Sequence, residues 1–177
     1  PSPADTTPDA ILDTDTPTVS VATYNVGLLG RRYLNTNLFM PDLTARRAQF
    51  ARCLVEKDID IWLLQELWEP VDMHRLQTMA IACGYRVYSA LGKARSAHGL
   101  AIMIRDSLID VSAPVVVEGA FYRHQYPFEY RPGPGIRRAW ISVQFVCRMW
   151  SKTLTIYNTH LSPFPAFWRH RNAQART

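Results

Sequence analysis

The sequence is poor in cysteine and lysine and has no long hydrophobic run. Its three cysteines are odd in number and widely spaced among apolar neighbours, so we expect buried free thiols rather than a disulfide framework or a zinc site. The longest apolar stretches fall well short of the roughly 18 residues that span a bilayer, so no transmembrane helix is expected. The chain starts at proline without a basic-then-apolar leader, so we expect a trimmed or processed chain, whether soluble, peripheral to a membrane or secreted.

Basic residues outnumber acidic ones, and nearly all of them are arginine. The formal net charge is +5, and residues 1–20 hold four aspartates and no Lys or Arg, so the remainder carries +9. Of the 20 basic residues, 17 are Arg, whose planar guanidinium pairs bidentately with phosphate. The composition therefore fits a phosphate-bearing partner, and it fits solvated faces and codon bias equally well.

The chain is expected to form one globular domain behind a short tail. With 47% apolar and 11% aromatic residues in 177, it can bury a real core. Residues 1–18 consist mostly of Pro, Asp, Thr and Ser and are predicted to be a disordered tail or linker. Residues 19–177 are predicted to form the folded portion.

Three predicted strands each lead into a polar side chain. The strands and the residues at their ends are 19–24 with Asn25, 59–64 with Glu66, and 154–159 with His160. The second is an almost unbroken apolar run, typical of a strand buried on both faces. If the three strand ends meet at one edge of a sheet, an amide, a carboxylate and an imidazole surround one cleft.

The remaining elements predict a mixed sheet or two packed sheets with helices outside. One helix is predicted from Thr44, as its cap, to about Lys57, and a second is capped by Asp72 and ended by Gly84. Further strand-like runs and a last helix are predicted at 85–90, 99–105, 108–117, 137–146, 152–160 and 162–177.

Each candidate site residue also has an ordinary structural interpretation. Asn25 is a residue type that tolerates the turn conformation at a strand end. Glu66 is equally a loop carboxylate paired with an arginine, and His160 a core histidine with its hydrogen bonds satisfied. His98 either lines the cleft or is a loop histidine, and the second is favoured. Gly99 is expected to serve close packing or a bend.

Four segments carry a resemblance to a known family. TYNVGLL, LLQELW, HGLAIMIR and IYNTHLS, in this order and each at a predicted strand or its exit, resemble the endonuclease/exonuclease/phosphatase superfamily of deoxyribonuclease-I-like phosphoesterases. The resemblance runs from Val19 to about Gln174. It implies an α/β (α+β) fold, a four-layer αββα sandwich of two packed mixed sheets, incomplete at the C-terminus.

The resemblance also implies roles for the residues at the strand ends. Asn25 and Glu66 would hold a divalent cation, Mg²⁺ or alternatively Mn²⁺, which accords with the oxygen ligands that hard cations prefer. Glu66 and His160 would be the catalytic residues, with His160 contacting the substrate phosphate and stabilising its growing negative charge. Arg171 and Gln174 resemble a mostly structural R-x-x-Q pair of the family.

Two motifs of the family are absent from the 177 residues. Neither G-D-x-N nor S-D-H occurs, so the groups that orient and activate the attacking water are missing. We therefore expect the N-terminal portion of a longer enzyme, inactive or nearly so alone. The alternative is a catalytically dead module that binds phosphate without turnover.

The substrate is expected to be a phosphodiester, with a phospholipid slightly favoured. YNVGLL and YNTHLSPF look like the neutral sphingomyelinases. Aromatic and arginine residues alternate in 118–138, and further aromatic residues follow in 164–168, which suits peripheral contact with a membrane. The same pattern suits nucleic acid almost as well, or an ordinary hairpin. DNA or RNA nuclease and inositol-phosphate phosphatase remain alternatives, and no oligomeric state is predicted.

Overall fold

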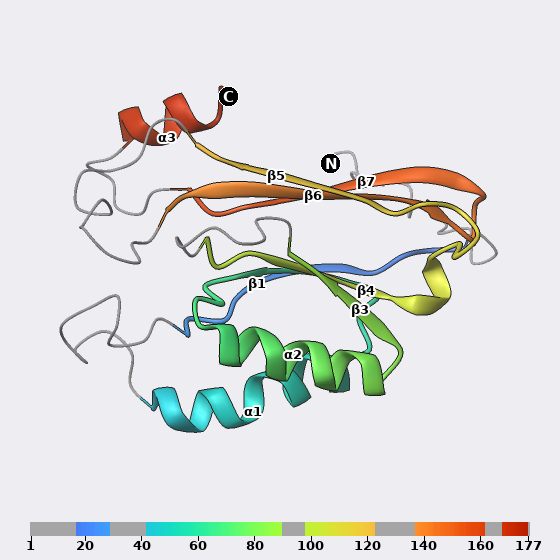
Figure 1. The fold of residues 1–177 in the computed structure, drawn as a ribbon, viewed down its shortest axis with the longest axis horizontal. Helices are drawn as coiled ribbons and strands as arrows, with labels where there is room; N and C mark the ends of the chain where they lie inside the picture. Colours follow the sequence, from blue (N-terminus) through green and yellow to red (C-terminus); the bar gives the residue numbers. More distant parts are fainter. Residues whose placement is uncertain (1–16, 29–41, 90–97, 123–136, 162–167, 177) are drawn as a thin grey trace, which may run out of the picture.

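The computed structural model describes residues 17–28, 42–89, 98–122, 137–161 and 168–176, and these form a layered sandwich (Figure 1). Helices α1 (Leu43–Glu56) and α2 (Pro70–Ala82) cover one face of a first sheet. A second sheet packs against the other face, and α3 (Trp168–Gln174) lies on its outer side. The predicted αββα architecture is confirmed. Residues 1–16 of the predicted tail lie outside the described residues.

The first sheet is mixed and has the strand order β1-β2-β4-β3. Strands β1 (Val21–Asn25) and β2 (Ile61–Gln65) are parallel, whereas β4 (Ala101–Arg105) is antiparallel to both β2 and β3 (Tyr85–Tyr88). The second sheet contains β5 (Val116–Phe121), β6 (Ala139–Cys147) and β7 (Lys152–Thr159), all antiparallel. The strand predicted at 108–117 starts later than expected, because Asp106–Leu108 form a 3-10 turn and the chain turns again at 111–112.

The core lies on both faces of the first sheet, which explains its continuous apolar sequences. In β4, Met103 packs towards the helices, whereas Ile102 and Ile104 pack between the two sheets. Successive strand residues point to opposite faces, so a central strand covered on both sides must be apolar at every position. Ile61 and Leu64 divide between the two clusters in the same way along β2.

The helices begin at other residues than those predicted. The N-cap of α1 is Asp42, and α2 begins at Pro70 after Glu69, so Thr44 and Asp72 are not caps. Asp72 is instead fully buried in the first turn of α2 and accepts a hydrogen bond from Arg47 Nε at 2.9 Å, which ties α2 to α1. Gly84 follows α2 with φ +77°, as expected at a helix end.

The prediction of free thiols is confirmed for all three cysteines, but the prediction that they are buried is correct for only one. Cys147 is buried in β6, whereas Cys53 and Cys83 are exposed at the helices, and all are free thiols. None of the described helices is long and apolar enough to cross a membrane.

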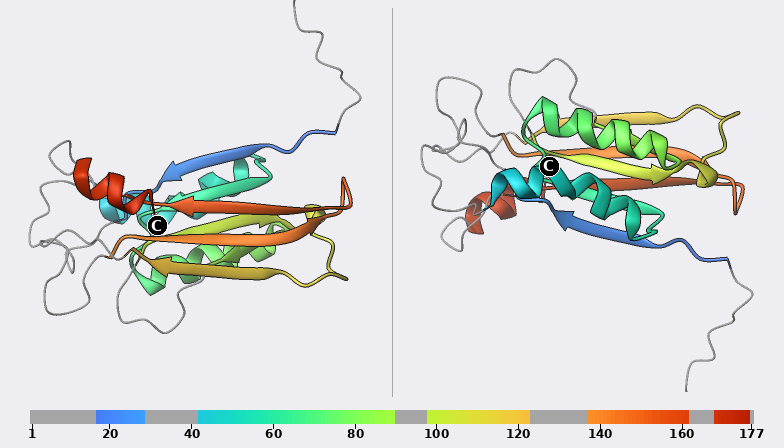
Figure 2. Two further views of the ribbon diagram at one scale, coloured as in Figure 1. Left: turned by 90° about the horizontal axis from the view of Figure 1, so that it is seen from above. Right: turned by 90° about the horizontal axis from the view of Figure 1, so that it is seen from below.

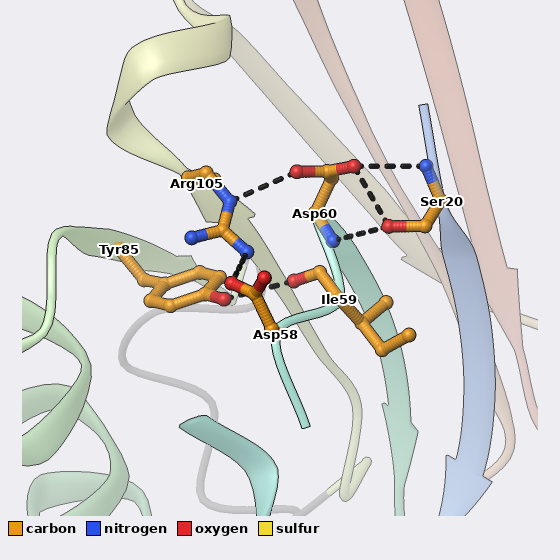
Figure 3. A network of polar contacts seen from close by, with 6 residues as sticks. All are labelled: Ser20, Asp58, Ile59, Asp60, Tyr85 and Arg105. Atoms are coloured by element: carbon orange, nitrogen blue, oxygen red, sulfur yellow. Dashed lines mark hydrogen bonds and ion pairs between the residues drawn. The ribbon is translucent and has the colours of Figure 1, made fainter. Parts of the chain in front are cut away.

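A polar network joins three strands at the end of the first sheet where β1 and β2 begin (Figure 3). Asp60 accepts hydrogen bonds from Ser20 N at 2.9 Å, from Ser20 Oγ at 2.7 Å and from Arg105 Nε at 2.8 Å. The Arg105 guanidinium also pairs with Asp58 at 2.6 Å and lies 4.8 Å from the centre of the Tyr85 ring. This end of the sandwich is called the far end below.

Candidate functional site

The carboxyl ends of β1, β2 and β7 meet at the opposite end of the sandwich, called the site end below (Figures 1 and 2). The parallel register sets Asn25 beside Gln65, so Asn25 and Glu66 leave neighbouring strands together. Strand β7 belongs to the second sheet. It is joined to β2 by a hydrogen bond from the Gln65 side chain to Asn158 Oδ1, at 2.9 Å. The structure thus brings together the three predicted residues, Asn25, Glu66 and His160.

Glu66 is held in an unusual backbone conformation as it leaves β2. Its φ is 65°, in the left-handed region that few residues other than glycine adopt. The turn is fixed because Glu66 O accepts a hydrogen bond from Leu28 N at 3.2 Å and Gln65 O accepts one from Val26 N at 3.0 Å. Strain of this kind persists only where the surroundings enforce it, and it clusters at functional sites.

Asn25 orients Glu66 through its side-chain amide. Asn25 Nδ2 donates to Glu66 Oε1 at 2.9 Å, and Asn25 Oδ1 accepts from Gly27 N at 2.9 Å. Gly27 has φ +60°, and a Cβ there would lie 2.5 Å from a guanidinium nitrogen of Arg46. An amide oxygen has two lone pairs, so Asn25 Oδ1 keeps one acceptor site beside the carboxylate.

The second carboxylate oxygen of Glu66 is buried and accepts no hydrogen bond from the described residues. The side chain as a whole is only 16% exposed. A buried anionic oxygen costs free energy unless a donor or cation meets it. Within the described ranges no three His, Cys, Asp or Glu side chains cluster closely enough to hold a metal. Two oxygen-bearing side chains still fit Mg²⁺, which keeps several waters and takes one or two protein ligands with substrate phosphates.

His160 reaches the same place from the end of β7. Its Nε2 lies 3.8 Å from Glu66 Oε1, its Nδ1 lies 2.9 Å from Arg138 NH1, and its ring centre is 6.4 Å from that of Trp68. Burial, with the positive charge of Arg138 as a second cause, lowers the pKa of His160 from 6.5 to about 4. The imidazole is therefore neutral at neutral pH.

Asn158 joins the two sheets beneath the site, and sequence reasoning missed it. Its side chain is 3% exposed and donates to Leu64 O at 2.8 Å and to Ala101 O at 2.9 Å. These contacts fix β7 against β2 and β4, and so fix the position of His160 two residues later. The sequence did contain an indication of this role: Asn158 stands at an inward-facing position of a predicted strand, where a buried side-chain amide must find hydrogen-bond partners.

Arg138 was not among the predicted site residues. It belongs to the segment 118–138, whose alternation of aromatic and arginine residues suited a membrane, a nucleic acid or an ordinary hairpin, and it is buried against His160, as Tyr122 is buried nearby. Tyr122 Oη lies 2.6 Å from Thr159 Oγ1, which joins Tyr122 to the end of β7. Arg137 stacks over the Phe121 ring at 4.0 Å. Residues 123–136 of the segment, and 162–167 after His160, lie outside the described residues.

His98 and Gly99 lie near Glu66 in the fold, because Gly99 O accepts a hydrogen bond from Leu67 N at 3.0 Å, but among the described residues neither forms a hydrogen bond or ion pair with Glu66. His98 Nδ1 accepts from Leu100 N at 3.0 Å, its Nε2 lies 3.3 Å from Ser89 Oγ, and burial lowers its pKa to about 4. Gly99 has φ +68°, and a Cβ there would lie 2.9 Å from the Trp68 ring. This geometry agrees with the close packing predicted for Gly99. In α3, Gln174 is 1% exposed, in accordance with a structural position.

Comparison by sequence finds no match, but comparison by structure does. No known family and no curated protein matches the sequence. Humanized D. rerio TDP2 superposes with a TM-score of 0.62 at 20% identity, over 89% of this chain and 56% of that one. ANGEL2, a 2′,3′-cyclic phosphatase, superposes with a TM-score of 0.66 at 19% sequence identity, over 89% of this chain and 44% of that one. Sphingomyelinase C from Streptomyces griseocarneus superposes with a TM-score of 0.62 at 17% sequence identity, over 91% of this chain and 57% of that one.

The similarity extends along this chain but not along its neighbours. Nearly all of the chain is matched, yet it spans 39–58% of the length of the eight solved structures compared. At identities of 13–20% the likeness establishes a shared fold.

Proposed function

The chain has the fold of the endonuclease/exonuclease/phosphatase, or deoxyribonuclease-I-like, superfamily, and from this premise we propose that it is the N-terminal portion of a phosphodiester hydrolase. Its structural neighbours are hydrolytic enzymes of phosphate esters, which supports a hydrolase in general. The fold alone hosts many substrates, so the argument for this chain depends on its site.

One observation carries the proposal: Glu66 Oε2 is buried beside the Asn25 amide and the His160 imidazole, and none of the described residues donates a hydrogen bond to it. Asp72 Oδ1 also lacks a described hydrogen-bond donor, but the Arg75 guanidinium lies 3.9 Å from that oxygen, whereas no described arginine or lysine forms an ion pair with Glu66. The arrangement instead supports a site for a cation and a phosphate, because both would supply the contacts that these side chains lack.

Asn25 and Glu66 would hold the divalent cation, Mg²⁺ or Mn²⁺. When bound, the cation would polarise the phosphodiester and offset its negative charge. The fit depends on oxygen donors alone, which Asn25 Oδ1 and Glu66 Oε2 provide. Asn25 also holds the carboxylate in place through its hydrogen bond to Oε1.

His160 would act as a hydrogen-bond donor to a phosphate oxygen. Its ring is neutral, and Nε2 is the nitrogen on the side of Glu66. In the proposed reaction a water oxygen attacks phosphorus and the bond to the leaving-group oxygen breaks in line. His160 would stabilise the charge that grows on the non-bridging oxygens. The base that takes the proton of water is not assigned to any of these 177 residues.

A sphingomyelin-like phospholipid is the substrate that we favour. The two motifs that look like neutral sphingomyelinases support it, as does the stacking of Arg137 on Phe121 near the site, a pairing suited to a lipid–water interface. Nuclease and inositol-phosphate phosphatase activities are the alternatives, since one fold can host enzymes with different substrates.

The test is a hydrolysis assay of the protein encoded by the complete reading frame, with the 177-residue chain beside it. Sphingomyelin vesicles, plasmid DNA and an inositol polyphosphate are offered with Mg²⁺ and with EDTA. We expect EDTA-sensitive phosphocholine release by the longer protein and little or none by the shorter chain. DNA cleavage that falls steeply with salt would instead assign a nuclease. No turnover by a folded longer protein would contradict the hydrolase and favour the phosphate-binding module.

A further inference from the structure

Arg138 is a buried arginine at the site end. It lies just before β6, and its backbone oxygen accepts a hydrogen bond from Tyr122 N at 3.0 Å, which fixes the main chain. The side chain is 6% exposed. A guanidinium is always charged and offers only donors, so its burial is costly unless it faces acceptors.

His160 supplies one of these acceptors. Arg138 NH1 lies 2.9 Å from His160 Nδ1. Because the guanidinium can only donate, Nδ1 must accept and carries no proton. A neutral imidazole then carries its single proton on Nε2. That nitrogen lies 3.8 Å from Glu66 Oε1, too far for a hydrogen bond to the carboxylate.

We propose that Arg138 is a positioning residue that fixes the tautomer and the ring orientation of His160, so that a neutral imidazole presents Nε2–H on the side of Glu66 as a hydrogen-bond donor. The catalytic consequence depends on the proposed function, since the donor is useful only if a phosphate oxygen binds there. The tautomer itself does not depend on it.

The opposite tautomer would disable the site in two ways. With the proton on Nδ1, that hydrogen would face the Arg138 guanidinium, placing donor against donor. Nε2 would then present a lone pair towards Glu66 Oε1 and could offer no hydrogen bond to a phosphate oxygen. Without Arg138 the His160 ring could rotate or change tautomer. Nε2–H would then face the side of Glu66 in only part of the molecules.

The first test is nitrogen NMR of the 177-residue chain labelled at histidine. We expect His160 Nδ1 to give the signal of an unprotonated ring nitrogen and Nε2 that of a protonated one, at neutral pH. Arg138→Met should shift both signals towards a mixture of tautomers, whereas Arg137→Met, which removes the neighbouring charge, should leave them unchanged. A protonated Nδ1 in the unmodified chain would overturn the proposal, whether or not any variant folds.

The second test uses the active longer protein. Arg138→Met is expected to lower kcat about tenfold or more with a smaller change in KM, because the donor acts mainly on the transition state. Arg138→Lys, which keeps a charged donor, should recover part of kcat. Equal kcat in the parent and Arg138→Met would overturn the positioning role. If the NMR signature holds but the longer protein is inactive, the proposed function fails and the tautomer assignment stands.

Discussion

Asp60 and Glu66 flank the same strand, β2, and differ in how their charges are satisfied. Asp60, at the far end, accepts three hydrogen bonds from Ser20 and Arg105 (Figure 3). Glu66, at the site end, accepts one from Asn25, has a buried oxygen without a described donor, and adopts a left-handed backbone conformation.

The two carboxylates, six residues apart, differ in role: Asp60 stabilises the fold, whereas Glu66 is the proposed functional residue. Burial acts to raise the pKa of Asp60, but the hydrogen bonds from Ser20 and the contact with Arg105 outweigh it and leave the pKa lowered. A lowered pKa means that folding favours the ionised carboxylate, so Asp60 stabilises the protein. Glu66 receives no comparable support from the described residues, and its buried Oε2 is the oxygen proposed to bind a cation.

The largest expected effect is that of Glu66→Gln on catalysis. In the active longer protein, loss of the anionic oxygen should lower kcat by about 10²- to 10³-fold at saturating Mg²⁺, because an amide is a poor substitute ligand. The free energy of unfolding should change by less than about 1 kcal/mol. Glu56→Gln, which alters an exposed carboxylate in α1, is the matched control. Retained turnover in Glu66→Gln would refute the assigned role.

Asp60→Asn should produce the reverse pattern. Placing an amide nitrogen among the donors of Ser20 and Arg105 leaves at least one of them unpaired, so the free energy of unfolding should fall by roughly 2–3 kcal/mol. Asp58→Asn is the control, since Asp58 is 87% exposed and its pair with Arg105 should be worth under about 1 kcal/mol. Urea unfolding of each chain measures the difference, and equal losses in both would contradict the comparison.

The site end should be the first to lose stability in acid. The pKa of buried His98 is lowered from 6.5 to about 4, so between these values the unfolded chain binds a proton that the folded chain does not. Stability therefore falls as pH drops from 6.5 to 4, with His98 contributing on the order of 2 kcal/mol. Asp60, with its lowered pKa, keeps its full contribution down to about pH 3.8 and loses it only as the pH falls further, towards the pKa of the folded state.

Unfolding measured across this pH range in the parent and in His98→Gln tests the assignment. The loss between pH 6.5 and 4 should be smaller in His98→Gln, and His74→Gln, at an exposed helix position, should behave like the parent. Parallel curves for the parent and His98→Gln would show that His98 does not cause the loss.

The smallest effect is expected from another ion pair of the first sheet. Arg86 Nε lies 2.6 Å from Asp106 Oδ1, but both side chains are nearly half exposed, so water competes for each charge. Arg86→Met should lower the free energy of unfolding by about 0.5 kcal/mol or less. A loss as large as that of Asp60→Asn would mean that proximity of charges, rather than satisfaction of a partly buried carboxylate, stabilises this sheet.

The sequence was sufficient for the strands that carry the site but not for what surrounds it. The polar residues after three predicted strands indicated that Asn25, Glu66 and His160 would surround one cleft if the three strand ends met at one edge of a sheet. Parallel pairing of β1 and β2 does bring Asn25 and Glu66 together, but β7 carries His160 to the site from the second sheet. The contact of Arg138 with His160 joins residues 22 positions apart across two strands. No local pattern distinguishes that buried arginine from the other arginines of its segment.

The predicted helix starts were wrong for a related reason. Aspartate is a common N-cap residue, but the Asp72 carboxylate instead accepts a hydrogen bond from Arg47 and so joins α2 to α1. The inter-sheet amide Asn158 was likewise unpredictable in its partners, Leu64 O and Ala101 O, although its inward position could have been read from the alternation of β7.

The most direct test of the contrast is paramagnetic broadening by Mn²⁺ in the 177-residue chain, followed at two NMR signals. The account predicts that the Asn25 side-chain amide, beside Glu66, broadens at low Mn²⁺ concentration and loses this response in Glu66→Gln. The backbone amide of Ser20, bound to Asp60, should stay sharp. Equal broadening of both signals, or none at Asn25 up to millimolar Mn²⁺, would contradict the cation site at Glu66.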